Sequence, residues 1–267
     1  MLIETCLPLW HTSKHRVNKT AANIGLPKEM ENQTTITSQY KAAKLAGLLY
    51  LIAMATGLFA EFYVRFPSTL VINGDVAKTA YNILSNERLY RIGIANNIIT
   101  FAIDVVLIWA LYVLLRPVNR NLALLAVFFR LVETAIACVA IINYYVAMQF
   151  VVDVDQAKAT FDSNQIQALS ILHDTYALTF IIVAIFLGLG STVFNYLLLK
   201  SRYIPRVLAI WGIFSSLILL ISQFAIVIFP EVEKTIIPAC YGPIVIDEIA
   251  LGFWLLFKGA NLPTMES

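Results

Sequence analysis

Six long apolar stretches dominate this chain of 267 residues. A helix needs roughly 20 predominantly apolar residues to cross the hydrocarbon core of a bilayer, and each stretch reaches that length. They run approximately over residues 44–63, 89–115, 122–151, 171–199, 207–229 and 238–257. We therefore predict an all-α fold, a polytopic integral membrane protein whose six transmembrane helices form one bundle.

The composition supports a membrane protein and excludes several other classes. Hydrophobic residues make up 59% of the chain and charged residues 13%, whereas soluble domains average about 25% charged residues. The net charge of +2 is too small to attract DNA, and the basic residues are scattered over short connections. We expect the lipid bilayer as a partner and no nucleic acid. The sequence specifies neither a small-molecule substrate, nor a protein partner, nor an oligomeric state.

The distribution of Lys and Arg predicts the orientation, because cytoplasmic loops carry an excess of both residues. If the N-terminus is cytoplasmic, the larger set lies on that side: Lys14, Arg16, Lys19, Lys28, Lys41, Lys44, Arg116, Arg120, Lys200, Arg202, Arg206 and Lys258. The smaller set lies opposite: Arg65, Lys78, Arg88, Arg91, Lys158 and Lys234. We predict that both termini are cytoplasmic.

The chain divides into one membrane domain with two flanking segments. Residues 1–40 are rich in Thr, Asn, Lys and Glu without apolar periodicity, so we expect a disordered cytoplasmic extension. Translation starting at Met30 is an equally weighted alternative for this segment. Residues 41–259 form the six-helix domain, and residues 260–267 form a short cytoplasmic tail. We interpret residues 152–168 as a short solvated turn.

Metal and cofactor motifs are not evident. Cys6, Cys138 and Cys240 have no CxxC spacing. His11 and His15 have a spacing of four residues but no helical pattern and no third ligand. We predict no metal site and no cofactor.

Enzyme motifs are equally weak. The sequence Gly188-Leu-Gly-Ser191 is neither a nucleophile elbow nor a phosphate loop, because it lies inside an apolar stretch with no strand before it. Ala184 and Gly188 form a small-xxx-small pair that favours close helix packing. A soluble-type active site is not expected, and an intramembrane enzyme is only a third hypothesis.

Polar residues inside the apolar stretches are the informative feature, because an ionised side chain at the centre of a span costs roughly 2.5–3.5 kcal/mol. In the second stretch, Gly93, Asn97, Thr100 and Asp104 recur at spacings of three and four residues. This spacing places them on one helix face.

Five charged residues are predicted to share one depth. Counted at about 1.5 Å per residue from the cytoplasmic boundaries, Asp104, Arg130 and Glu248 lie roughly 15–18 Å deep, near the midplane. Glu133 and Asp247 lie close to the same level. Adjacent helical residues point about 100° apart, so Asp247 and Glu248 cannot both face one neighbour.

Two interpretations of this midplane cluster remain open. Arg130 can be an internal staple, satisfied by Glu133 three residues away and by Asp104. Alternatively, the cluster lines a hydrated cavity for a substrate or for protons.

A second group of polar residues is expected on the outer side. Glu61, His173 and Asp174 should lie near the outer interface, where partial hydration makes polar groups inexpensive. Asn97 lies on the outer part of the polar face of the second stretch. We interpret His173 and Asp174 as an interfacial pair in preference to a proton relay.

Several segments resemble a known family. They are KLAGLLYLIAMATGLFAEFYVR, PVNRNLALLAVFFRLVETAI, which contains Arg130 and Glu133, and LLLKSRYIPRVLAIWG. The chain resembles, over roughly residues 40 to 259, the bacterial multi-pass membrane proteins catalogued as domain of unknown function family 4386. The resemblance implies a multi-pass protein of the bacterial inner membrane, and it implies no activity.

Two hypotheses of function follow. The first is transport of a small polar solute, a cation or a proton through the midplane cluster. The second is a non-transport membrane component with a partner-binding or stress-related role, whose intramembrane charges are structural. Transport predicts water-accessible positions near the cluster, and a purely structural role predicts dry ones.

Overall fold

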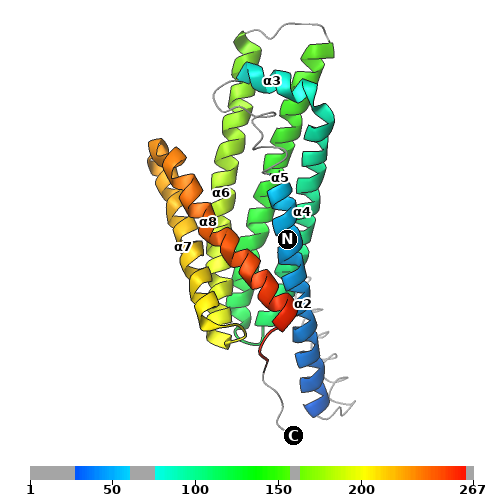
Figure 1. The fold of residues 1–267 in the computed structure, drawn as a ribbon, viewed down its shortest axis with the longest axis vertical. Coiled ribbons are helices and arrows are strands. Elements are labelled where there is room, and N and C mark those ends of the chain that lie inside the picture. Colours follow the sequence, from blue (N-terminus) through cyan, green and yellow to red (C-terminus); the bar gives the residue numbers. More distant parts are fainter. Residues whose placement is uncertain (1–27, 61–75, 157–162, 263–267) are drawn as a thin grey trace, which may run out of the picture. The chain divides into compact units, whose positions relative to one another are not determined.

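The computed structural model describes residues 28–60, 76–156 and 163–262 (Figure 1). The chain forms two compact units, residues 1–38 and residues 39–267. Of the first unit, only the helical residues 28–38 are described. Everything that follows concerns the second unit unless stated otherwise.

The described residues are helical almost throughout. The α-helices are α2 (Lys28–Phe59), α3 (Val76–Ser85), α4 (Glu87–Leu115), α5 (Arg120–Gln156), α6 (Ser163–Ser201), α7 (Arg206–Ile228) and α8 (Glu233–Phe253). A short 3-10 turn, η2 (Pro230–Val232), precedes α8, and a π-helical turn, η3 (Trp254–Lys258), follows it. Six of these helices are long and apolar enough to cross a membrane: α2, α4, α5, α6, α7 and α8. The predicted six-helix membrane fold is confirmed.

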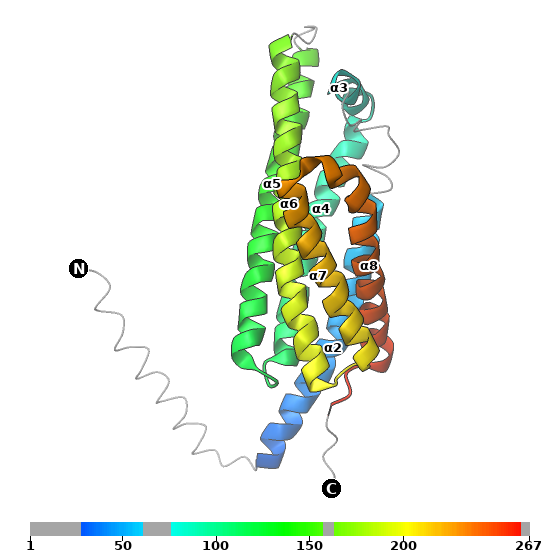
Figure 2. The same ribbon diagram turned by 90° about the vertical axis from the view of Figure 1, so that its left-hand side faces the viewer.

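Helices that are consecutive in the chain pack side by side from α4 to α8. The bundle is closed by α2, which meets α8 at two glycines. A Cβ atom on Gly47 of α2 would lie 2.7 Å from the carbonyl oxygen of Gly252 in α8. Figure 2 shows α8 running beside α2. The absence of a side chain at Gly47 therefore allows the two backbones to touch.

One apolar core joins all six spanning helices. It includes Ala46 of α2, Leu111 of α4, Ala126 of α5, Leu197 of α6 and Leu255 beyond α8, with Ala209 of α7 alongside. Other large apolar side chains point outward, among them Val207, Ile221 and Phe257, which are 80%, 66% and 71% exposed. An apolar exterior of this kind contacts the lipid bilayer.

Both ends of the membrane domain lie at the same end of the bundle. The side-chain amide of Gln39, at the start of the unit, donates to the Leu114 carbonyl over 2.9 Å and to the Tyr203 hydroxyl over 3.2 Å. The backbone N–H of Asn261 donates to the Tyr203 carbonyl over 2.9 Å. We call this the Tyr203 end, and the opposite end, which carries α3, the α3 end.

The structure differs from the predicted solvated turn at residues 152–168. Helix α5 continues through Gln156, and α6 begins at Ser163. At about 1.5 Å per residue, the 37 residues of α5 span about 55 Å, well beyond a hydrocarbon core of about 30 Å. Met148 and Val151 of α5 are buried with Ile83 of α3 in a second apolar core. Helix α3 therefore covers apolar surface near the ends of these two helices.

The N-terminal boundary also differs from expectation. Residues 28–40, which we expected to be disordered, are part of α2. No proline occurs from Lys28 to Phe59, and Ala42 and Ala43 are buried, so packing of the following turn supports the helix at this point. Residues 1–27 lie outside the described residues, with Cys6, His11 and His15 among them. The alternative start at Met30 stays a prediction.

Candidate functional site

The predicted pair on α5 is present. Nη1 of Arg130 lies 2.8 Å from Oε2 of Glu133, three residues further along the helix. Arg130 is 6% exposed and Glu133 is 7% exposed. Among the described residues, Arg130 is the only buried Lys or Arg. The spacing of three residues brings the two side chains together on one helix face, as the sequence predicts.

Arg130 reaches the interior of the bundle across a glycine of α6. A Cβ atom on Gly190 would lie 2.7 Å from Cγ and 2.8 Å from Cδ of Arg130. The aliphatic part of the arginine therefore occupies the space that any other residue at position 190 would fill. This contact directs the guanidinium into the bundle, away from lipid.

Three further helices each bring a polar side chain within electrostatic range of Arg130. These side chains are Asp104 of α4, Glu248 of α8 and Tyr50 of α2. Asp104 and Glu248 are half-buried, and Tyr50 is 9% exposed. We call these five residues the Arg130 cluster: Tyr50, Asp104, Arg130, Glu133 and Glu248. The structure thus brings together four of the five midplane residues that the sequence indicates and adds Tyr50.

The fifth residue, Asp247, faces a different neighbour from Glu248. It is 2% exposed, and its Oδ2 accepts a hydrogen bond of 3.4 Å from Nδ2 of Asn195 in α6. Consecutive positions on a helix diverge by about 100°, which explains why Asp247 and Glu248 separate. Asn195 was not predicted as a site residue. The sequence feature that distinguishes Asn195 is that it is the single amide in the otherwise apolar run from Val193 to Leu199.

The polar face of α4 forms a contact with α2, displaced by one residue from the predicted position. Thr100 Oγ1 donates to Thr56 Oγ1, and Nδ2 of Asn96 donates to the Thr56 carbonyl, each over 2.9 Å. The sequence pattern indicated Asn97 in this place. Asn97 is half-buried, and Asn96 makes the contact because it lies one turn, four residues, from Thr100.

Other outer-side predictions cannot be placed. Glu61 lies outside the described residues. His173 and Asp174 fall within α6, and their side chains are outside the described part of the chain.

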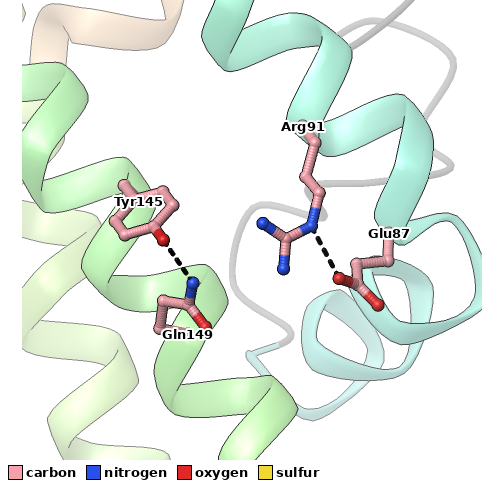
Figure 3. A network of polar contacts seen from close by, with 4 residues as sticks. All are labelled: Glu87, Arg91, Tyr145 and Gln149. Carbon is pink, nitrogen blue, oxygen red and sulfur yellow. Dashed lines mark hydrogen bonds and ion pairs between the residues drawn. The ribbon is translucent and has the colours of Figure 1, made fainter.

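The polar contacts toward the α3 end are exposed and do not form a site. Arg91 Nε lies 2.7 Å from Oε1 of Glu87, and the two side chains are 45% and 40% exposed. On the facing helix α5, Gln149 donates to the Tyr145 hydroxyl, as Figure 3 shows. An exposed ion pair of this kind contributes about 0–1 kcal/mol. These residues therefore belong to the hydrated surface.

Small residues on α6 pack as the sequence predicts. A Cβ atom on Gly188 would lie 3.0 Å from the carbonyl oxygen of Ser216 in α7. Ala184, one turn earlier, is buried with Leu219 of α7 and Ile244 of α8. The pair serves helix packing. Within the described ranges, no group of three or more His, Cys, Asp or Glu side chains is arranged to hold a metal ion.

The fold and the buried charges define a polytopic α-helical membrane protein with a polar cluster inside its bundle. The chain belongs to the family defined by the domain of unknown function DUF4386, whose family model matches residues 45–259. That range contains the whole Arg130 cluster together with Asn195 and Asp247. Searches of curated proteins and of solved structures found no match.

Proposed function

We propose that this protein is a transporter of the bacterial inner membrane, and that its Arg130 cluster binds a proton, a cation or a small positively charged polar solute. The observation that carries the proposal is the surplus of acidic groups. Asp104, Glu133 and Glu248 share a single guanidinium at one site inside the bundle. The excess of Lys and Arg in the loops of the Tyr203 end supports an orientation with both termini in the cytoplasm.

Charge balance favours a positively charged ligand. Glu133 neutralises Arg130 at 2.8 Å, which leaves Asp104 and Glu248 without a full positive partner in the cluster. An ionised group in the middle of a span is expensive, so such groups mark ion or proton pathways more often than they serve packing. Asp104 and Glu248 are both half-buried, whereas Arg130 and Glu133 are buried. The surplus acids are therefore less enclosed than the Arg130–Glu133 pair.

A structural role is the second candidate, and it has its own support. The Arg130 stem packs against Gly190, and the guanidinium pairs with Glu133 on the same helix. The first contact would hold α5 against α6 whether or not any ligand binds, and the second would satisfy the guanidinium within α5. In that case, the chain would be a membrane component whose charges serve packing, with a partner-binding or stress-related role.

Cysteine accessibility separates the two candidates. Single cysteines at Thr100 and at Ala137 lie one helical turn from Asp104 and from Glu133, in a background in which the three native cysteines are replaced by serine. Transport predicts that a charged, membrane-impermeant thiol reagent modifies these positions from one side of the membrane. Val139→Cys is the control, because Val139 is 52% exposed on the lipid-facing surface whereas Ala137 is 2% exposed.

The expected result is reaction at positions 100 and 137, with none at position 139. Protection of the first two positions to the level of position 139 would contradict transport and favour the structural role. Because Thr100 bonds to Thr56, the folded fraction of each variant must be measured before labelling.

A further inference from the structure

Asp247 and Asn195 form a polar pair between α6 and α8 that the Arg130 cluster does not explain. Asp247 is 2% exposed and Asn195 is 4% exposed. They share one long hydrogen bond of 3.4 Å. Within the described part of the chain, Oδ1 of Asp247 and Oδ1 of Asn195 have no hydrogen-bond partner. Two buried acceptor oxygens thus lack a donor.

A buried carboxylate needs a positive partner or a proton, because burying an unpaired charge is very costly. Asn195 is neutral and cannot supply that charge. Among the described residues, the salt bridge of Arg130 is made with Glu133, and none is made with Asp247. The buried Asp247 carboxylate therefore requires a small cation that oxygen atoms can bind.

Helix α7 adds more oxygen atoms beside Asn195. A Cβ atom on Gly212 would lie 2.5 Å from Cγ of Asn195, so the amide lies directly on the α7 backbone. The Gly212 carbonyl accepts hydrogen bonds from the Ser215 hydroxyl over 3.1 Å and from the Ser216 hydroxyl over 2.7 Å. Both serines are 0% exposed. Both hydroxyl protons are therefore used within α7, and neither serine supplies a donor to the unpartnered oxygens of Asp247 and Asn195.

We propose that Asp247 and Asn195, with the amide lying against Gly212 of α7, form a second site that binds a small cation, H⁺ or Na⁺. This inference goes beyond the proposed function, because it concerns the contact of α6 and α7 with Asp247 of α8. It would stand even if the Arg130 cluster bound nothing.

The two occupants use the same oxygens differently. A proton on the Asp247 carboxyl group donates to Oδ1 of Asn195 once the amide turns over and exchanges its N and O positions. Sodium instead draws oxygen ligands from the carboxylate and the amide. The titratable groups within electrostatic range of Asp247 are Glu248 on its own helix and Tyr50 of α2. The groups that α6 and α7 contribute here do not titrate.

The sodium arm of the test uses thermal unfolding of the full chain in detergent. NaCl is titrated against choline chloride at constant ionic strength. A site for Na⁺ predicts an unfolding temperature that rises with Na⁺ in the wild type, because a ligand that binds only the folded state stabilises it. Asp247→Asn should lower the rise, and Glu231→Gln, the matched control at an exposed glutamate, should retain it in full.

The proton arm uses infrared spectroscopy of the same samples without Na⁺. A site for H⁺ predicts a C=O stretching band of a protonated carboxyl group that disappears reversibly at high pH. The difference spectrum between the wild type and Asp247→Asn should contain this band, and the difference spectrum between the wild type and Glu231→Gln should not. The two arms therefore identify which small cation occupies the site.

The proposal is overturned if the wild type shows neither response, or if both responses are unchanged in Asp247→Asn. Should Asp247→Asn fail to fold, Asn195→Ser keeps the test. Removing the amide should weaken the Na⁺ response about tenfold or more, or shift the carboxyl band. An Asn195→Ser protein with wild-type behaviour in both measurements would also overturn the proposal. Because Asp247→Asn leaves the residues of the Arg130 cluster in place, its effect on these two responses is distinguishable from the effect of Glu248→Gln on ion flux.

Discussion

Arg130 is the residue on which the charge arrangement depends. Its stem lies against Gly190, and its guanidinium pairs with Glu133 inside a bundle whose other buried side chains are mostly apolar. Removing one partner of a buried pair costs about 3–5 kcal/mol, because the remaining charge stays in the interior without compensation. Replacing a surplus carboxyl group by an amide removes charge and keeps the shape. Loss of the cation should therefore harm folding more than loss of one acid.

We predict that Arg130→Ala lowers the folded fraction in the membrane much more than Glu248→Gln does. The measurement is the monodisperse peak of detergent-extracted protein in size-exclusion chromatography, normalised to expression. If Arg130→Ala and Glu248→Gln both fold in wild-type amounts, Arg130 is not needed to compensate the acids of the Arg130 cluster.

At the scale of the helices, two contacts determine how the outer elements dock. The first is the approach of α2 to α8 at Gly47 and Gly252. The second is the packing of α3 on the extended ends of α5 and α6, where Ile83 is 3% exposed.

Gly47→Ala is expected to destabilise the protein although alanine favours helices. The new methyl group would meet the α8 backbone at 2.7 Å, and backbone atoms cannot move aside as a flexible side chain can. Overpacking of this kind typically costs about 1–3 kcal/mol. Gly242→Ala is the matched control, because a Cβ atom there meets nothing within 4 Å. It should be neutral or stabilising by up to about 1 kcal/mol. Thermal unfolding in detergent compares the two variants, and an equal effect of both would contradict the close approach of α2 and α8.

Ile83→Ala tests whether α3 is a packed element. Truncating a buried isoleucine typically costs about 2–5 kcal/mol. We expect faster proteolysis within α3 in Ile83→Ala than in the wild type. Tyr81→Ala should behave like the wild type, because Tyr81 is 69% exposed on the same helix. Identical proteolysis of all three proteins would show that α3 does not depend on this contact.

At the scale of the whole molecule, the sequence predicts features that lie within one helix, and it does not predict contacts between distant helices. The six spans follow from apolar length, and the Arg130–Glu133 pair follows from a spacing of three residues, since both are properties of a single helix. The Asn195–Asp247 and Gln39–Leu114 contacts join distant helices, and periodicity along one helix carries no information about the partner helix. The short helix α3 has only 10 residues, so its apolar pattern was too brief to recognise.

At the same scale, orientation gives a direct prediction. Gln39 and Asn261 both bond to Tyr203, so the two ends of the membrane domain share one end of the bundle. Together with the distribution of Lys and Arg, this places both termini in the cytoplasm in our proposal. Alkaline phosphatase fused after Ser267 should be inactive, because this reporter is active only in the periplasm, and a green fluorescent protein fusion at the same point should fluoresce. The reverse pattern would contradict the orientation.

The proposal that the Arg130 cluster transports a cation is tested most directly by ion flux through purified protein in liposomes. Vesicles carry a pH-sensitive dye in one series and a Na⁺-sensitive dye in another, and a potassium diffusion potential drives cations inward. We predict that the wild type carries at least one of these ions faster than Glu248→Gln by about tenfold or more, equivalent to about 1.4 kcal/mol in the barrier. Glu231→Gln, which makes the same chemical change at an exposed glutamate, should match the wild type. Flux of both ions through the wild type that equals flux through protein-free liposomes would contradict the proposal that the Arg130 cluster transports a cation.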